Sequence, residues 1–164
     1  MTRLNRGWFV LVAGALFAPG CGDDGGCPDT GPANVTLDAS SVFKGTLTLV
    51  GTLTLPKGSA SGKAVRLAVA GGGTTAKGSV SALAEGTTTG ESVTYSITGL
   101  IEGTYTVRAN VDMNDNGRLG EPGDLDGYSG GTLDAPVLES TAAQKIALGA
   151  DGASCVNFGL AVLP

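Results

Sequence analysis

The residues best suited to chemistry lie in one acidic loop, VDMNDNGRLGEPGDLDGYSGG, from Val111 to Gly131. Its first sixteen residues hold five carboxylates and one cation, a third of the fifteen acids in the chain. Asp112, Asn114 and Asn116 stand at alternate positions, with Gly117 directly after them. Oxygen ligands in this pattern suit calcium, because three side-chain oxygens can converge on one ion when the chain curls around it. The spacing therefore predicts a calcium-stabilised loop.

The remaining ligands of such a site would come from the second half of the loop. The expected donors there are the carbonyl of Arg118, which Gly117 allows to turn inward, and one of the acids Glu121, Asp124 and Asp126, with Asp124 favoured for its reach. The pattern is not an EF-hand, because Gly123 stands at the twelfth position, where a bidentate glutamate belongs, and a strand enters the loop. Two neutral ligands predict weak affinity. The alternative is an acidic turn without an ion, since Asn, Asp and Gly are common turn formers.

The composition argues against catalysis. The chain contains no histidine, which removes Ser-His-Asp and Cys-His chemistry and the commonest zinc sites. A carboxylate pair could serve a glycosidase, but the clustered acids all lie in one loop, where ion binding or solvation explains them more simply. The chain is therefore expected to be non-catalytic. Tyr128, in the same loop, is a possible contact for a ligand.

The first twenty residues have the layout of a secretory signal peptide. Arg3 and Arg6 form a basic region, and an apolar run of ten residues follows from Trp8 to Phe17. This run is too short to span a membrane as a helix. Cleavage would remove the segment 1–20.

A cysteine follows the apolar run directly. The segment Phe17-Ala18-Pro19-Gly20-Cys21 resembles the lipobox of bacterial lipoproteins, although Ala18 stands where leucine is usual. The resemblance implies lipidation of Cys21, which would anchor an extracytoplasmic protein to a bacterial membrane; plain secretion is the alternative. The glycine-rich segment 21–33 would form a flexible tether.

Charge and cysteine count restrict the mature chain further. Loss of Arg3 and Arg6 leaves eight cations against fifteen acids, a net charge of −7. Such a chain has no electrostatic footprint for nucleic acid. With Cys21 lipidated, Cys27 and Cys155 remain, and we expect them to form a disulfide in an oxidising compartment. Closing a loop of this length would stabilise the fold by about 4 kcal/mol.

The elements around the loop follow a period of two. In GTYTVRANVD, Tyr105, Val107, Ala109 and Val111 alternate with polar residues, and SVTYSITGL alternates in the same way. Residues 100–103 join these two runs, and this short connection predicts a hairpin. Further expected strands are 35–40, 45–55 with a bulge at Val50-Gly51, 64–70, 77–84, 141–148 and 154–163. The pattern predicts an all-β domain over 34–164: an antiparallel two-sheet sandwich of seven or eight strands, without a helix.

One segment carries a family resemblance. The run TYSITGLIEGTYTVRANVDMNDNGRLGEPGD is similar to the closing strands of prealbumin-like and carboxypeptidase-regulatory-like β-sandwich modules. The matching positions are Gly99, Leu100, Gly103, Tyr105 and Val107, followed by Asp112, Asn114, Asn116 and Gly117. The resemblance covers about forty residues and implies the sandwich fold. It implies little about function, because such modules serve as spacers, binders and enzyme appendages.

Two functional hypotheses follow. The first is a lipid-anchored binding or structural module with a calcium-stabilised loop. The second is an accessory module that binds an extracellular glycan, peptide or protein partner through the surface of loop 112–131.

Overall fold

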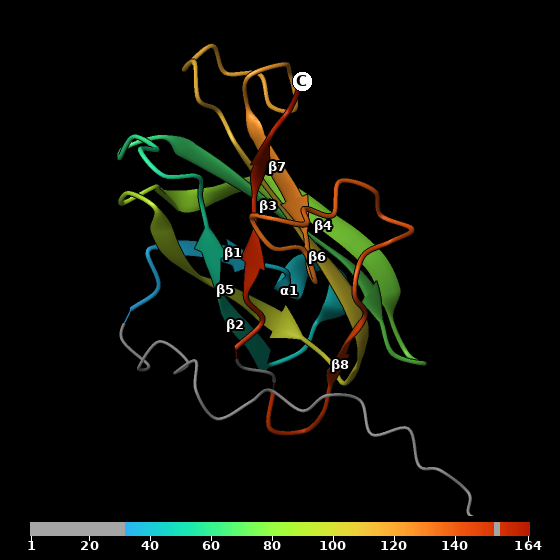
Figure 1. The fold of residues 1–164 in the computed structure, drawn as a ribbon. Helices are drawn as coiled ribbons and strands as arrows, with labels where there is room; N and C mark the ends of the chain where they lie inside the picture. Colours follow the sequence, from blue (N-terminus) through green and yellow to red (C-terminus); the bar gives the residue numbers. More distant parts are fainter. Residues whose placement is uncertain (1–31, 153–154) are drawn as a thin grey trace, which may run out of the picture.

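The computed structural model describes residues 32–152 and 155–164, which form ten strands and one helical turn (Figure 1). The elements are β1 Val35–Asp38, α1 Ser40–Phe43, β2 Leu47–Thr54, β3 Ala64–Gly72, β4 Lys77–Thr87, β5 Ser92–Leu100, β6 Gly103–Val111, β7 Leu125–Tyr128, β8 Ile146–Leu148, β9 Phe158–Gly159 and β10 Ala161–Val162. The expected signal peptide 1–20, Cys21, Cys27 and most of the tether 21–33 lie outside the described residues. Within the described ranges, no helix is long and apolar enough to cross a membrane.

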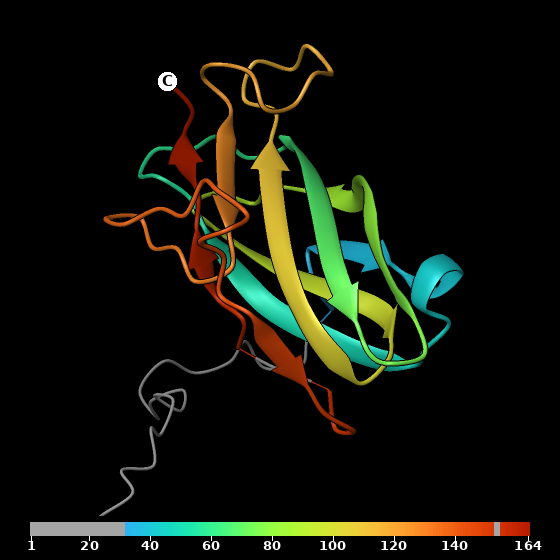
Figure 2. The same cartoon turned by 90° about the vertical axis from the view of Figure 1, so that its right-hand side faces the viewer.

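The all-β prediction is confirmed, but the two-sheet sandwich of seven or eight strands is wrong. The ten strands form one continuous sheet in the order β10-β7-β6-β3-β4-β1-β5-β2-β9, with β8 paired to β6. The sheet is mixed, because β1 runs parallel to β5 and β9 runs parallel to β2. It bends back on itself, so that β3 and β6 lie on one side of the core and β2 on the other (Figure 2).

The bend lies in β4, the longest strand. Residues 77–83 and Thr87 of β4 pair with β3, whereas Glu85 and Gly86 between them pair with β1. Gly86 has φ 122°, and a Cβ there would lie 2.0 Å from the carbonyl oxygen of Asn34. A strand that pairs with neighbours in both halves of the sheet has the same alternating sequence pattern as a strand that pairs within one half. Alternation alone therefore could not separate one bent sheet from two stacked sheets.

The predicted inward faces are confirmed. Val65, Leu67 and Val69 of β3, Val93, Tyr95 and Ile97 of β5, and Tyr105, Val107, Ala109 and Val111 of β6 are all at most 1% exposed. They belong to one core cluster shared by both halves of the sheet. The period-two rule thus identified the core of the three strands with the most regular alternation.

The predicted hairpin between β5 and β6 is wrong. β5 pairs with β1 and β2, whereas β6 pairs with β3, β7 and β8. The connection through Ile101 and Glu102 therefore crosses from one half of the sheet to the other. A short connection permits a hairpin but does not require one, because the partner of each strand is set by the whole sheet.

Several boundaries also differ from the expected ones. The irregularity in β2 falls between Leu47 and Leu49, not at Val50-Gly51. The expected strand 141–148 is reduced to β8, and the expected strand 154–163 is replaced by the two short strands β9 and β10. The helical turn α1 was not expected; Asp38 initiates it by accepting the N–H of Ser40 at 2.8 Å, and Phe43 anchors it in the core. β7 lies within the segment 111–131, for which the sequence predicts a loop.

Candidate metal site in the loop between β6 and β7

The acidic loop runs from Asp112, just after β6, to Asp124, just before β7, at the end of the molecule that holds the C-terminus (Figure 1). Two backbone hydrogen bonds fix it to the C-terminal residues. The N–H of Gly123 donates to the carbonyl of Leu163 at 2.9 Å, and the N–H of Leu163 donates to the carbonyl of Asp124 at 2.8 Å. At the other end, the N–H of Asp112 donates to the carbonyl of Ala64 at 3.1 Å, so backbone hydrogen bonds hold both ends of the loop.

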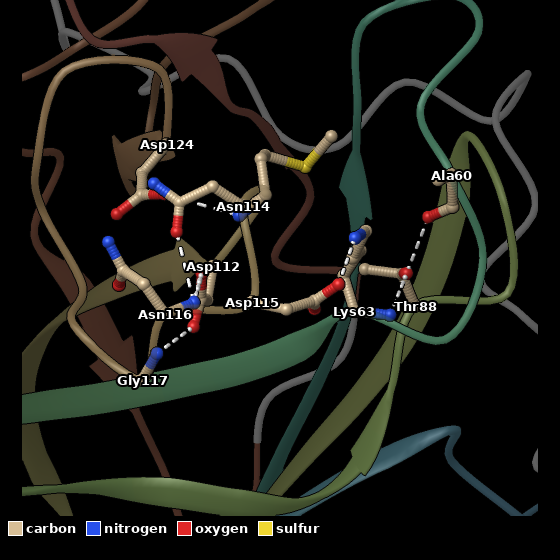
Figure 3. Close-up of polar contacts among 10 residues, drawn as sticks. Ala60, Lys63, Thr88, Asp112, Asn114, Asp115, Asn116, Gly117 and Asp124 are labelled. Atoms are coloured by element: carbon tan, nitrogen blue, oxygen red, sulfur yellow. Dashed lines mark hydrogen bonds and ion pairs between the residues drawn. The ribbon is translucent and has the colours of Figure 1, made fainter.

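Asp112 and Asn114 turn their side-chain oxygens toward the backbone amide of Asn116. The N–H of Asn116 lies within hydrogen-bonding distance of two oxygens, Oδ1 of Asp112 at 3.3 Å and Oδ1 of Asn114 at 3.0 Å (Figure 3). The other Asp112 oxygen accepts the N–H of Gly117 at 2.8 Å. Oδ1 of Asn116 accepts the N–H of Arg118 at 2.7 Å. The structure thus brings the oxygens of Asp112 and Asn114 together around one amide, as the spacing predicted.

Asp124 holds the second half of the loop together. Its side chain is fully buried, and its Oδ1 accepts the N–H of Met113 at 3.1 Å. Its Oδ2 accepts the N–H groups of Gly120 and Glu121 at 3.1 and 3.2 Å. Three donors on one carboxylate satisfy backbone groups that a buried turn would otherwise leave unpaired. Asp124 therefore joins the two ends of the loop.

The five carboxylates differ in their partners. Asp115 forms an ion pair with Lys63, Glu121 lies 3.5 Å from Arg118, and Asp126 pairs with Arg108. Asp112 and Asp124 have no cationic partner among the described residues. They are also two of the most buried acids, 3% and 0% exposed. Two buried carboxylates in one loop are thus balanced by backbone N–H groups alone.

Thr88, in the connection between β4 and β5, positions Lys63. The N–H of Lys63 donates to Oγ1 of Thr88 at 3.0 Å, and the Thr88 hydroxyl donates to the carbonyl of Ala60 at 2.8 Å (Figure 3). Thr88 is 2% exposed, so this link is shielded from solvent. Asp115, which faces Lys63, has φ 57°, in the left-handed region. The pair draws Asp115 away from the inward-facing oxygens of the loop.

The donor set fits a hard cation only in part. No group of three or more His, Cys, Asp or Glu side chains in the described residues is placed to hold a metal ion. Calcium also accepts neutral amide and carbonyl oxygens, which this loop offers through Asn114, Asn116 and Arg118. Glu121 is the more accessible closing acid, since its side chain is 38% exposed and its carboxylate contacts only two side chains among the described residues, the Asn116 amide at 3.0 Å and Arg118 at 3.5 Å. The arrangement suits a weak calcium site and not a tight transition-metal site.

Tyr128 lies on β7, beyond the loop. It is half-buried, and the guanidinium of Arg108 sits 5.2 Å from its ring centroid. Nε and Nη2 of Arg108 donate to the two oxygens of Asp126 at 2.9 and 2.6 Å. These hydrogen bonds raise the pKa of Arg108 above its ordinary value, so it remains charged. Asp126, one of the three acids expected to close the metal site, instead pairs with Arg108.

No protein-family model matches the chain, and no curated protein or solved structure matches it either. Lys63 and Arg108 were missed by sequence reasoning. No local pattern marks them, because each lies far along the chain from the acid it pairs with.

Proposed function

We propose that this protein is a non-catalytic extracytoplasmic module, lipid-anchored through Cys21, whose loop 112–124 is stabilised by calcium. Asp112, Asn114 and Asn116 would supply side-chain oxygens, with the carbonyl of Arg118 and the carboxylate of Glu121 or Asp124 completing the set. When bound, calcium would neutralise the carboxylates and order the loop.

The burial of Asp112 and Asp124 without a cation carries this proposal. Burying a carboxylate is costly unless a charge or several hydrogen bonds compensate it. Backbone donors supply part of that compensation, and one N–H on each Asp112 oxygen leaves a further lone pair on each. A divalent cation next to these oxygens would supply the rest.

The anchor and the disulfide complete the proposal. The lipobox-like segment supports lipidation of Cys21. Cys155 is not a free thiol, which supports a bridge to Cys27. Incorporation of radiolabelled palmitate that is lost in Cys21→Ser tests the anchor. Its retention in Cys21→Ser would refute the anchor and leave the calcium proposal intact.

Thermal melting in calcium and in EDTA tests the metal site. The full chain, purified in detergent, is melted in millimolar calcium and in EDTA, with Asp112→Ala and Asn116→Ala beside the wild type. A calcium concentration about tenfold above Kd stabilises a protein by about 1.4 kcal/mol, which shifts Tm by a few degrees. We expect this shift in the wild type and its loss in both variants.

The matched control is Asp134→Ala, which removes an exposed acid outside the loop. It should keep the full calcium shift, because the readout is the difference between buffers within each variant. Identical wild-type melts in the two buffers would refute the calcium site, and so would a loss of the shift in Asp134→Ala equal to that in Asp112→Ala.

A further inference from the structure

We propose that the outer face of β3, β4 and β6 binds an anionic polysaccharide of the uronate type in a groove that uses no residue of loop 112–124. Two hollows make up this groove. One, of about 570 Å³, is lined by Lys77, Lys145 and the neighbouring backbone of β3 and β6. The other, of about 350 Å³, is lined by Arg108, Tyr128 and several hydroxyls. The hollows adjoin, because Ala70 and Thr106 line both.

The charge of the groove is opposite to that of the protein. Lys77 and Lys145 are exposed, and neither forms an ion pair with any described residue. No aspartate or glutamate is among the described residues that line either hollow. In a chain with fifteen acids and ten cations, such a surface is selective for a negatively charged partner.

Arg108 and Tyr128 extend the groove at its other end. Asp126 engages Nε and Nη2 of Arg108, and Nη1 makes no hydrogen bond with any described residue. The side chain of Arg108 is 37% exposed. A guanidinium fixed by one carboxylate and open on another nitrogen is positioned to donate to a second carboxylate. The aromatic ring beside it supplies the flat surface that sugar rings contact.

The floor of the groove favours a glycan over an acidic peptide. β3 is paired on both edges, to β4 and β6, and β6 is paired to β3 on one edge and to β7 and β8 on the other. A peptide therefore cannot add to β3 or β6 as an extra strand. The face instead offers hydroxyls at regular intervals, such as those of Ser79 and Thr106, next to cations. Hydroxyls and cations together match the hydroxyl and carboxylate groups of a uronate chain.

Binding to hyaluronan, a polymer containing glucuronate, tests the proposal. The full chain in detergent is titrated with hyaluronan oligosaccharides, neutral dextran and poly-glutamate at low ionic strength, by isothermal titration calorimetry. We expect binding to hyaluronan, none to dextran and much weaker binding to poly-glutamate. The Lys77→Gln/Lys145→Gln variant should raise Kd for hyaluronan about tenfold or more.

The matched control is Lys44→Gln/Lys57→Gln, which removes two exposed cations that line neither hollow. It should bind hyaluronan as the wild type does. Equal weakening in both double variants would show unspecific attraction and overturn the site. Absence of hyaluronan binding, or poly-glutamate binding of equal strength, would also overturn it. The calcium melts are independent of these results, since the groove shares no residue with loop 112–124.

Discussion

The hydroxyl of Tyr105 forms two hydrogen bonds with the backbone of Ile101, four residues earlier. It donates to the Ile101 carbonyl at 2.8 Å and accepts the Ile101 N–H at 3.3 Å. The Tyr105 ring is buried and packs edge-on against Phe43, with centroids 5.4 Å apart. The same arrangement occurs in the tyrosine corner of β-sandwiches. Here it fixes the connection that carries the chain from β5 in one half of the sheet to β6 in the other.

Replacing Tyr105 by Phe should therefore destabilise the fold. The ring and its packing remain, but the backbone N–H and carbonyl of Ile101 lose their hydrogen-bond partner. We therefore expect the free energy of unfolding, measured in urea, to fall by about 1–2 kcal/mol. Tyr128→Phe is the matched control, because the Tyr128 hydroxyl makes no hydrogen bond with a described residue, and it should change stability by less than about 0.5 kcal/mol. Equal costs for the two variants would contradict the role of the corner.

Two glycines with nearly the same φ should differ in their tolerance of alanine. Gly99 has φ 78° and Gly117 has φ 76°. A Cβ on Gly99 would lie 2.4 Å from the nitrogen of Ser40, whereas a Cβ on Gly117 would meet nothing within 4 Å. Gly117→Ala should lower the free energy of unfolding by about 1 kcal/mol, because only the strain of a side chain at positive φ is added. Gly99→Ala should cost about 3 kcal/mol or more, because the backbone must also move. Similar midpoints in urea for the two variants would contradict this reading.

The pair Arg108–Asp126 should contribute far more to stability than Arg118–Glu121. Asp126 is 3% exposed and depends on Arg108 for its charge partner. Arg108→Met should therefore cost about 2–4 kcal/mol, and Asp126→Leu in the same chain should recover much of that loss. Arg118 is 77% exposed, so a double-mutant cycle on its pair with Glu121 should give a coupling below about 0.5 kcal/mol. Equal coupling energies for the two pairs would show that burial does not govern their strength.

The sequence predicted the structure best where one local rule decides which residues face the core. β3, β5 and β6 alternate over most of their length, and their inward faces follow from that pattern. β7 was missed because Asp126 and Gly127 are poor strand formers, and pairing with β6 and β10 imposes the strand. The overall sheet was misjudged because β4 pairs in both halves, a property of the assembled fold.

The candidate site was predictable in its ligands but not in its environment. The spacing of Asp112, Asn114 and Asn116 showed that their oxygens could converge. The ion pair of Asp115 with Lys63 and the three backbone donors on Asp124 depend on how distant segments meet. The sequence shows only that five acids share one loop, whereas the fold pairs three of them with cations and buries the other two without one among the described residues.

Stability should fall at alkaline pH through Tyr95. This residue is 1% exposed, its hydroxyl donates to the carbonyl of Val156 at 2.7 Å, and burial raises its pKa above the ordinary 10.0. Below pH 10 both folded and unfolded chains keep the proton, so the contribution is fully present. Above pH 10 the unfolded chain releases it while the folded chain retains it, and stability falls by about 1.4 kcal/mol per pH unit for this group. Urea unfolding between about pH 9 and 11.5 should show a shallower decline in Tyr95→Phe than in the wild type, by about that amount. Parallel declines would mean that Tyr95 ionises as readily in the folded chain as in the unfolded one.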